Sequence, residues 1–253
     1  MLDQQTIEKL YAMRLNAMAE ALNDQNNCTD FAELSFNERF GILVDRQWTW
    51  KEDRRMKRLL KNAKLKINAC VEDIDYRTPR GLDRSVMLNL IGCDWIRKQQ
   101  NVIITGATGV GKTFIACALA NKACREGFKS FYARIPRFLY DLSIAKADGS
   151  YPSLMTRLAN THLLIFDDLG LAPFSAADAR SLLEVIEDRT TTASTIVATQ
   201  LPVDKWHENI QDQTVADALL DRLVHNAHRI NLNGESMRKT LSSLTEKQHG
   251  VKN

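Results

Sequence analysis

The chain has 253 residues, of which 44% are hydrophobic and 26% charged, an ordinary composition that allows one medium domain and one smaller one. No apolar run approaches membrane-spanning length and we find no secretory signal, so we expect a cytoplasmic protein without a membrane partner. The five cysteines show neither C-x-x-C pairing nor metal spacing, and we expect reduced thiols rather than a disulfide or zinc framework.

The first seventy or so residues are predicted to be helical. Apolar residues recur at helical spacing from Ile7 to Leu22. After a polar break, Ser35 and Glu38 form a capping-box pattern that begins a second long helix, which continues towards Lys66.

The charge of this region is unevenly distributed. Residues 1–45 hold three Lys or Arg against eight Asp or Glu, whereas residues 46–68 hold nine against two. This excess, together with Trp48 and Trp50, favours nucleic-acid binding over an ordinary solvated helix face. We expect residues 1–70 to form a helical domain that binds DNA through its phosphates and its shape, without base reading. The candidate contacts are Lys51, Arg54, Arg55, Lys57, Arg58, Lys61 and Lys64.

Beyond this domain the pattern changes. Pro79 and Gly81 indicate a linker, which we place at residues 71–84. Strand and helix signals then alternate. The predicted strands are 101–105, 129–133, 162–167, 194–199 and 228–232, and the predicted helices are 113–126, 136–147, 176–189 and 214–226. We therefore predict an α/β domain over residues 85–253, with a parallel sheet flanked by helices.

An apolar strand runs directly into a G-x-x-x-x-G-K-T motif. Its glycines permit a tight turn whose N–H groups cradle phosphates, and the following helix directs its positive end to the same place. Lys112 is expected to reach the β- and γ-phosphates and Thr113 to ligate Mg²⁺. The strand–turn–helix context disfavours a turn without a ligand. The candidate nucleotide contacts are Gly106, Ala107, Thr108, Gly109, Val110, Gly111, Lys112 and Thr113.

A second apolar strand ends in two adjacent carboxylates, Asp167 and Asp168. Ligands of open α/β sheets bind beyond the carboxyl ends of the strands. Asp167 is the candidate Mg²⁺ ligand, and Asp168 is the candidate that orients or deprotonates the attacking water. Since small-molecule kinases need no such second acid, the pair favours hydrolysis over phosphoryl transfer to a metabolite.

Three polar residues further along extend this site. Gln200 follows the strand 194–199, and it is either a contact to the γ-phosphate or water or a plain strand cap. Arg222 and Arg238 are each compatible with a surface charge. Together they suit a pair that neutralises transition-state charge, one in trans and one in cis.

The order of these motifs resembles that of AAA+ ATPases. The stretches 200–207, 221–228 and 234–239 resemble the IstB-like helper ATPases of insertion sequences and the related DnaC helicase loaders, and the resemblance covers nearly the whole chain. It implies a P-loop AAA+ core that binds ATP and Mg²⁺ and forms a homo-oligomer with ATP at subunit interfaces. By this resemblance Lys112 and Thr113 match Walker A, Asp167 and Asp168 Walker B, Gln200 sensor 1, Arg222 the arginine finger and Arg238 sensor 2.

The sequence departs from the AAA+ pattern in two places, and the resemblance also suggests two further DNA contacts. Asp168 stands where most AAA+ proteins have Glu, which is expected to slow hydrolysis, and only 21 residues follow Leu232, so we expect a truncated C-terminal lid. In related assemblies the region of Arg134 and Arg137 faces the central channel, which makes both residues candidate DNA contacts.

The favoured function is an AAA+ ATPase that oligomerises on duplex DNA, deforms it, and recruits or stimulates a cognate transposase. The alternative is a helicase loader that acts on a replicative helicase and single-stranded DNA. A metabolic P-loop kinase would have no basic helix, and a non-hydrolysing structural DNA binder would tolerate loss of Asp168.

Overall fold

The computed structural model describes residues 2–171, 173–210 and 212–237. The chain divides into two compact units, with the division between Arg58 and Leu59. Residues 59–70 of the predicted helical domain and the predicted linker 71–84 therefore group with the second unit, and the limits of the functional domains stay a prediction.

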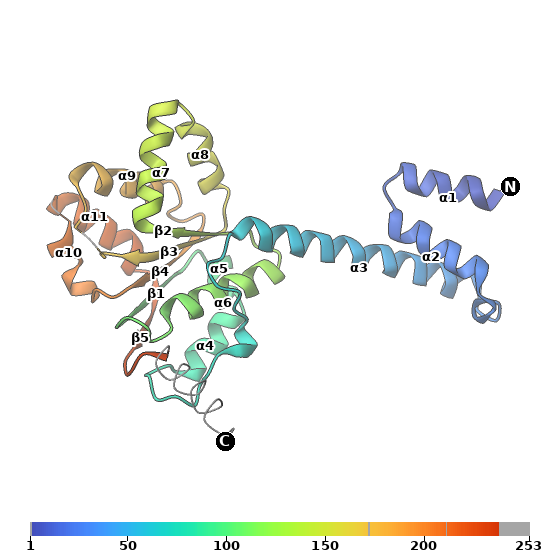
Figure 1. The fold of residues 1–253 in the computed structure, drawn as a ribbon, viewed down its shortest axis with the longest axis horizontal. Helices are drawn as coiled ribbons and strands as arrows, with labels where there is room; N and C mark the ends of the chain where they lie inside the picture. The colour runs from blue at the N-terminus through green and yellow to red at the C-terminus, as the bar shows by residue number, and fades with distance from the viewer. Residues whose placement is uncertain (1, 172, 211, 238–253) are drawn as a thin grey trace, which may run out of the picture. The chain divides into compact units, whose positions relative to one another are not determined.

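The first unit is helical, as predicted. It contains α1 (Leu2–Ala12), α2 (Asn16–Asn27), a 3₁₀ turn at Thr29–Phe31 and the greater part of α3 (Phe36–Ala63) (Figure 1). The apolar pattern from Ile7 to Leu22 is divided between two helices, because Arg14 adopts a φ of 61° in the turn between them.

The predicted capping box begins α3. The backbone N–H of Ser35 donates to Glu38 Oε2 (2.8 Å), and the N–H of Glu38 donates to Ser35 Oγ (3.4 Å). The hydrogen bonds from Ser35 lower the pKa of Glu38. The helix ends at Ala63, earlier than predicted, since Lys64 has a φ of 50°.

The second unit contains the predicted parallel sheet. Its strands are β1 (Asn101–Gly106), β2 (Ser130–Arg134), β3 (Leu163–Leu169), β4 (Ser194–Thr199) and β5 (Ala227–Leu232). All neighbours pair in parallel in the order β2-β3-β4-β1-β5 (Figure 1). Because β4 lies between β3 and β1, the loops after these three strands meet at one edge of the sheet.

Helices cover both faces of this sheet. The helices of the second unit are α4 (Arg84–Ile91), α5 (Asp94–Arg97), α6 (Lys112–Arg125), α7 (Ile135–Asp148), α8 (Tyr151–Ala159), α9 (Ala176–Glu187), α10 (Trp206–Asn209) and α11 (Gln213–Val224), with 3₁₀ turns at Val71–Asp73 and Val203–Lys205. In β1, Ile104 packs in the core that includes α4 to α6, whereas its neighbour Ile103 packs in the core that includes α7 to α11. The alternation matches a strand that is buried on both faces. The sequence did not predict α4, α5, α8 or α10.

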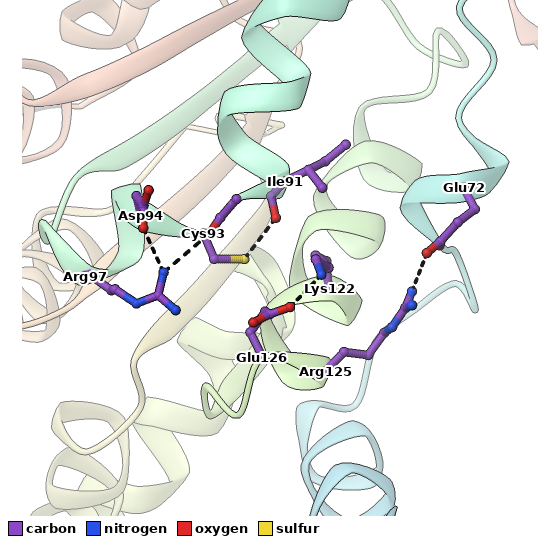
Figure 2. Close-up of polar contacts among 9 residues, drawn as sticks. Glu72, Ile91, Cys93, Asp94, Arg97, Lys122, Arg125 and Glu126 are labelled. Atoms are coloured by element: carbon purple, nitrogen blue, oxygen red, sulfur yellow. Dashed lines mark hydrogen bonds and ion pairs between the residues drawn. The ribbon is translucent and has the colours of Figure 1, made fainter.

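Three ion pairs lie on the surface beside α6. Arg125 pairs with Glu72 at 2.7 Å, Lys122 pairs with Glu126, and Arg97 pairs with Asp94 at 2.8 Å (Figure 2). Among them lies Cys93, whose pKa is raised to about 11 by burial. All five cysteines are free, as expected, and the buried Cys93 thiol is correspondingly unreactive.

Candidate functional site

The phosphate-binding loop lies between β1 and α6, at the carboxyl edge of the sheet. Gly106, Gly109 and Gly111 adopt φ values of 148°, 87° and 102°, which residues with a Cβ rarely adopt. The ammonium group of Lys112, the first residue of α6, donates to the carbonyl oxygens of Gly106 (2.8 Å) and Ala107 (2.7 Å). The loop thus has the turn and the helix N-terminus that phosphate binding requires.

Thr113 and Asp167 come together from α6 and β3. Thr113 Oγ1 lies 2.9 Å and 3.1 Å from the two carboxylate oxygens of Asp167. The carboxylate is buried, and it also accepts from the hydroxyl of Tyr132 (2.6 Å) and lies 3.5 Å from Lys66 Nζ. A hydroxyl and a carboxylate are oxygen ligands of the kind that Mg²⁺ prefers, so these donors fit the predicted metal role.

Sequence reasoning missed Tyr132 and Lys66. Tyr132 lies on β2, which pairs with β3 so that Tyr132 is opposite Ile165. Burial and the hydrogen bond to Asp167 raise the pKa of the Tyr132 phenol, which keeps it a donor. The order of the strands was the missing information, because only the pairing of β2 with β3 brings this phenol to Asp167.

Asp168 follows Asp167 at an irregularity in β3. The register with β4 shifts between Asp167 and Leu169, and Asp168 has a φ of 60°, which directs its side chain out of the strand pattern. Its Oδ2 accepts from Arg134 Nε at 2.7 Å. This contact raises the pKa of Arg134. The predicted DNA contact Arg134 therefore lies beside the predicted catalytic acid.

Gln200 contacts the phosphate-binding loop. It follows β4, and its side-chain oxygen accepts from the hydroxyl of Thr108 at 2.7 Å. Gln200 thus contacts the loop from the end of β4, and its role as a contact to the phosphate or the water stays a prediction.

Arg222 lies at the opposite edge of the sheet. Its backbone oxygen accepts from the side chain of Asn101, which begins β1, and its guanidinium pairs with Glu187 at 2.7 Å. A strand of six residues spans roughly 20 Å, so Arg222 is remote from the phosphate-binding loop of its own subunit. Arg238 and the part of the predicted lid that follows it lie outside the residues that the structure describes.

The predicted basic surface is exposed. Lys51, Arg54, Arg55, Lys57 and Arg58 are exposed residues of α3 in the first unit. Lys61 lies near the end of α3 and Lys64 follows it, both in the second unit.

Few contacts restrain these side chains. Arg54 lies over the ring of Trp50 (4.6 Å), and Arg55 lies 3.7 Å from Glu52. Arg137, on α7, pairs with Asp141 at 3.0 Å and is also exposed. Such exposed pairs are weak, so these groups are available to phosphates.

Comparison with known proteins assigns this chain to a family. Residues 8–245 match the family described as IstB-like ATP binding protein. The chain belongs to this family. The y4pL protein of Sinorhizobium fredii, named an insertion sequence ATP-binding protein, is 47% identical over 239 residues, which cover 94% of this chain and 98% of the relative. The IS1162 ATP-binding protein of Pseudomonas fluorescens is 46% identical over 203 residues, 80% of this chain and 88% of the relative.

Solved structures confirm the fold. The chain is similar to DnaI, with a TM-score of 0.55 and 16% identity over 70% of this chain and 93% of that one. It is similar to DnaA of Aquifex aeolicus, with a TM-score of 0.56 and 15% identity over 75% of this chain and 58% of that one. The predicted fold, a P-loop core with a parallel sheet flanked by helices, is thereby confirmed. In the described part of the chain, no helix is both long and apolar enough to cross a membrane.

Proposed function

We propose that this protein is an ATP-hydrolysing AAA+ protein that oligomerises on duplex DNA, deforms it, and recruits or stimulates the transposase of its insertion sequence. One observation carries the hydrolytic part: Thr113, Asp167 and Asp168 lie together beside the glycine-rich loop, with Asp167 buried and hydrogen-bonded. Names of relatives such as y4pL, which refer to ATP binding and to insertion sequences, support the nucleotide and the biological context.

The geometry supports a division of roles in hydrolysis. The loop N–H groups and Lys112 bind the phosphates, and Thr113 with Asp167 holds Mg²⁺, which neutralises phosphate charge when bound. Asp168 accepts the proton of the water that attacks the γ-phosphorus, and Gln200 orients that water. The bond to the leaving ADP then breaks, and phosphate and ADP depart.

The position of Arg222 supports assembly with ATP between subunits. Because Arg222 is remote from its own loop, its proposed role is to contact the γ-phosphate bound by a neighbour. A cleft of about 290 Å³ lies beside it, and residues of both charge signs, among them Lys98 and Asp221, line this cleft. Arg238 is proposed to contact the nucleotide of its own subunit.

The basic residues of α3 support duplex DNA as the partner. They are exposed and carry few competing ion pairs, which suits phosphate contacts of the kind that do not depend on sequence. Arg134 and Arg137 are proposed as a second set of contacts. Repeating these contacts along an oligomer would offset the cost of bending DNA, about 1–6 kcal/mol for a site of 20–30 base pairs.

Electron microscopy of the full chain with ATP and duplex DNA of varied length tests the proposal. We expect oligomers whose size grows with the DNA and whose DNA path departs from a straight rod. The cognate transposase should bind these oligomers and not the free protein. Assembly on single-stranded DNA alone, with capture of a replicative helicase, would instead support the helicase-loader function.

A further inference from the structure

Two carbonyl groups of the phosphate-binding loop are held by groups from other segments. The oxygen of Gly109 accepts from the backbone N–H of Met237 (3.0 Å), and the oxygen of Val110 accepts from Arg80 Nη1 (3.1 Å). In a trans peptide, the C=O of one residue and the N–H of the next point in opposite directions. Holding these two carbonyls therefore fixes the directions of the N–H groups of Val110 and Gly111.

These directions matter because loop N–H groups bind phosphate only when they converge on one point. Glycine populates positive and negative φ about equally, so a loop with glycine at residues 109 and 111 has little intrinsic preference for one peptide orientation. An external donor to a loop carbonyl supplies that preference. Arg80 is a side chain that can do so at the peptide between Val110 and Gly111.

Arg80 is itself firmly placed. It is 4% exposed, and its Nη2 donates to the carbonyl oxygen of Asp75 at 2.8 Å. Its backbone oxygen accepts from the N–H of Asn233 at 2.9 Å. A Cβ on Gly111 would lie 2.5 Å from Arg80 Nη1, so the guanidinium fills the space beside that glycine. The contact between Arg80 and the loop is therefore close, buried and braced from two sides.

The planar guanidinium suits this position better than an ammonium group would. It presents donors in a fixed fork, and here Nη1 and Nη2 reach two carbonyls of different segments at the same time. Burial lowers the pKa of Arg80, but an arginine remains protonated at neutral pH. The group thus supplies charged donors to the carbonyl oxygens of Val110 and Asp75.

We propose that Arg80 is a positioning residue for nucleotide binding: its guanidinium holds the Val110 carbonyl and thereby directs the Gly111 N–H at the phosphate chain. This inference rests on the proposed binding of ATP and adds a residue that the glycine-rich motif does not contain. Arg80 also links the loop to residues 75–81, so displacement of that segment would weaken phosphate binding without any change in the motif.

The test compares Arg80→Met and Arg80→Lys with Arg77→Met in the full-length protein. Arg77 lies in the same segment and is exposed, which makes it a matched control. Affinities for ATP, tripolyphosphate and adenosine are measured by competition with a fluorescent ATP analogue. We expect Arg80→Met to weaken ATP and tripolyphosphate binding about tenfold to a hundredfold, the range for a hydrogen bond to a charged group. Arg80→Lys should lose less, and adenosine binding should not change.

Circular dichroism and melting without nucleotide separate positioning from folding. A folded Arg80→Met or Arg80→Lys variant with wild-type ATP affinity would overturn the proposal. So would an equal loss of adenosine and tripolyphosphate affinity, or a failure of both variants to fold, since each indicates a purely structural role. A wild-type protein that does not bind ATP would instead defeat the proposed function itself.

Discussion

The nucleotide site and the basic helix differ in how their functional groups are held. At the nucleotide site, Asp167 is 1% exposed and receives hydrogen bonds from Thr113 and Tyr132, whereas the basic residues of α3 are exposed and weakly paired. Buried charges require partners, and those partners fix their positions. Exposed lysines and arginines keep their conformational freedom until phosphate is present.

This difference predicts two kinds of sensitivity to mutation. Where groups are fixed by their neighbours, a single substitution removes a geometry that nothing replaces. Where groups act as separate point charges, each contributes a similar increment to the binding free energy. When one group is removed, the neighbouring groups can still bind phosphate. The two regions should therefore respond in opposite ways to single and multiple substitutions.

The largest effects are expected at the phosphate-binding loop and the acid beside it. Lys112→Ala should abolish nucleotide binding, because Lys112 is proposed to pair with phosphates in the ground state. Asp168→Asn should retain binding and lower turnover about a hundredfold to ten-thousandfold, because the proposed role of this acid is to act on the water. ATP affinity and the rate of phosphate release, measured on both variants, separate the two roles. Equal loss of ATP affinity in both would contradict the assignment.

A smaller but still large effect is expected at Arg222. Arg222→Ala should lower ATP hydrolysis about a hundredfold to a thousandfold, the range for a lost donor to transition-state charge. Mixing it with Asp168→Asn subunits should restore part of the activity, because an intact Asp168 then meets an intact Arg222 from the neighbour.

The measurement is ATP turnover across mixing ratios, with assembly followed by light scattering. Mixtures that assemble normally and stay inactive at every ratio would show that Arg222 is a surface charge held by Glu187.

An effect that depends on salt is expected at the basic helix. Each phosphate contact contributes a slope of about −0.9 in log affinity against log salt, so Arg54/Arg55/Arg58→Glu should reduce the slope by about 2.7 per subunit. Single substitutions should each reduce it by about a third of that amount. DNA affinity is measured as salt is varied, with and without ATP.

The matched control reverses the same number of charges elsewhere. Lys129, Arg157 and Arg180 are exposed residues of the second unit, and changing all three to Glu alters the net charge equally. If both triple variants weaken DNA binding to the same extent, net charge explains the effect. The basic surface of α3 would then have no special role.

The two regions also differ in how far the sequence predicted them. The glycine-rich motif and the apolar strand before Asp167 and Asp168 predicted the loop, the strand–helix alternation and the edge of the sheet at which Thr113, Asp167 and Asp168 come together. These predictions succeeded because the constraints are local: a tight turn needs glycine, and a buried parallel strand needs an apolar run. The charge excess on α3 predicted a surface, but no local constraint ties those residues to one geometry.

The residues that sequence reasoning missed are those whose role depends on topology. Tyr132 reaches Asp167 only because β2 pairs with β3, and Arg80 reaches Val110 from a segment that reads as a linker. Lys66 reaches Asp167 from the segment that follows the end of α3 at Ala63. Strand order and the contacts of such connecting segments are set by long-range packing, which periodicity and motifs do not report.

The smallest predicted effect concerns two serine N-caps, one in each unit. Ser35 caps α3 in a capping box with Glu38, and Ser175 caps α9 by accepting from the N–H of Asp178 at 3.1 Å. Ser35→Ala and Ser175→Ala should each cost about 1 kcal/mol, because a helix N-terminal N–H loses its acceptor. In hydrogen exchange, Ser35→Ala should lower the protection of amides at the start of α3, and Ser175→Ala should lower it at the start of α9. Neither substitution should change exchange in the other helix.

The cap at Ser35 should also depend on pH. Its hydrogen bonds lower the pKa of Glu38 below the ordinary value of 4.5, so their stabilisation is present above that pH and is lost as the pH falls through the lowered pKa. The difference in exchange between wild type and Ser35→Ala should therefore shrink in acid. A difference that stays constant down to the lowest pH at which the protein folds would show that the Ser35 hydroxyl acts on the backbone alone. If Ser35→Ala speeds exchange in α9 as much as in α3, the two units unfold together, and the contrast between them does not extend to stability.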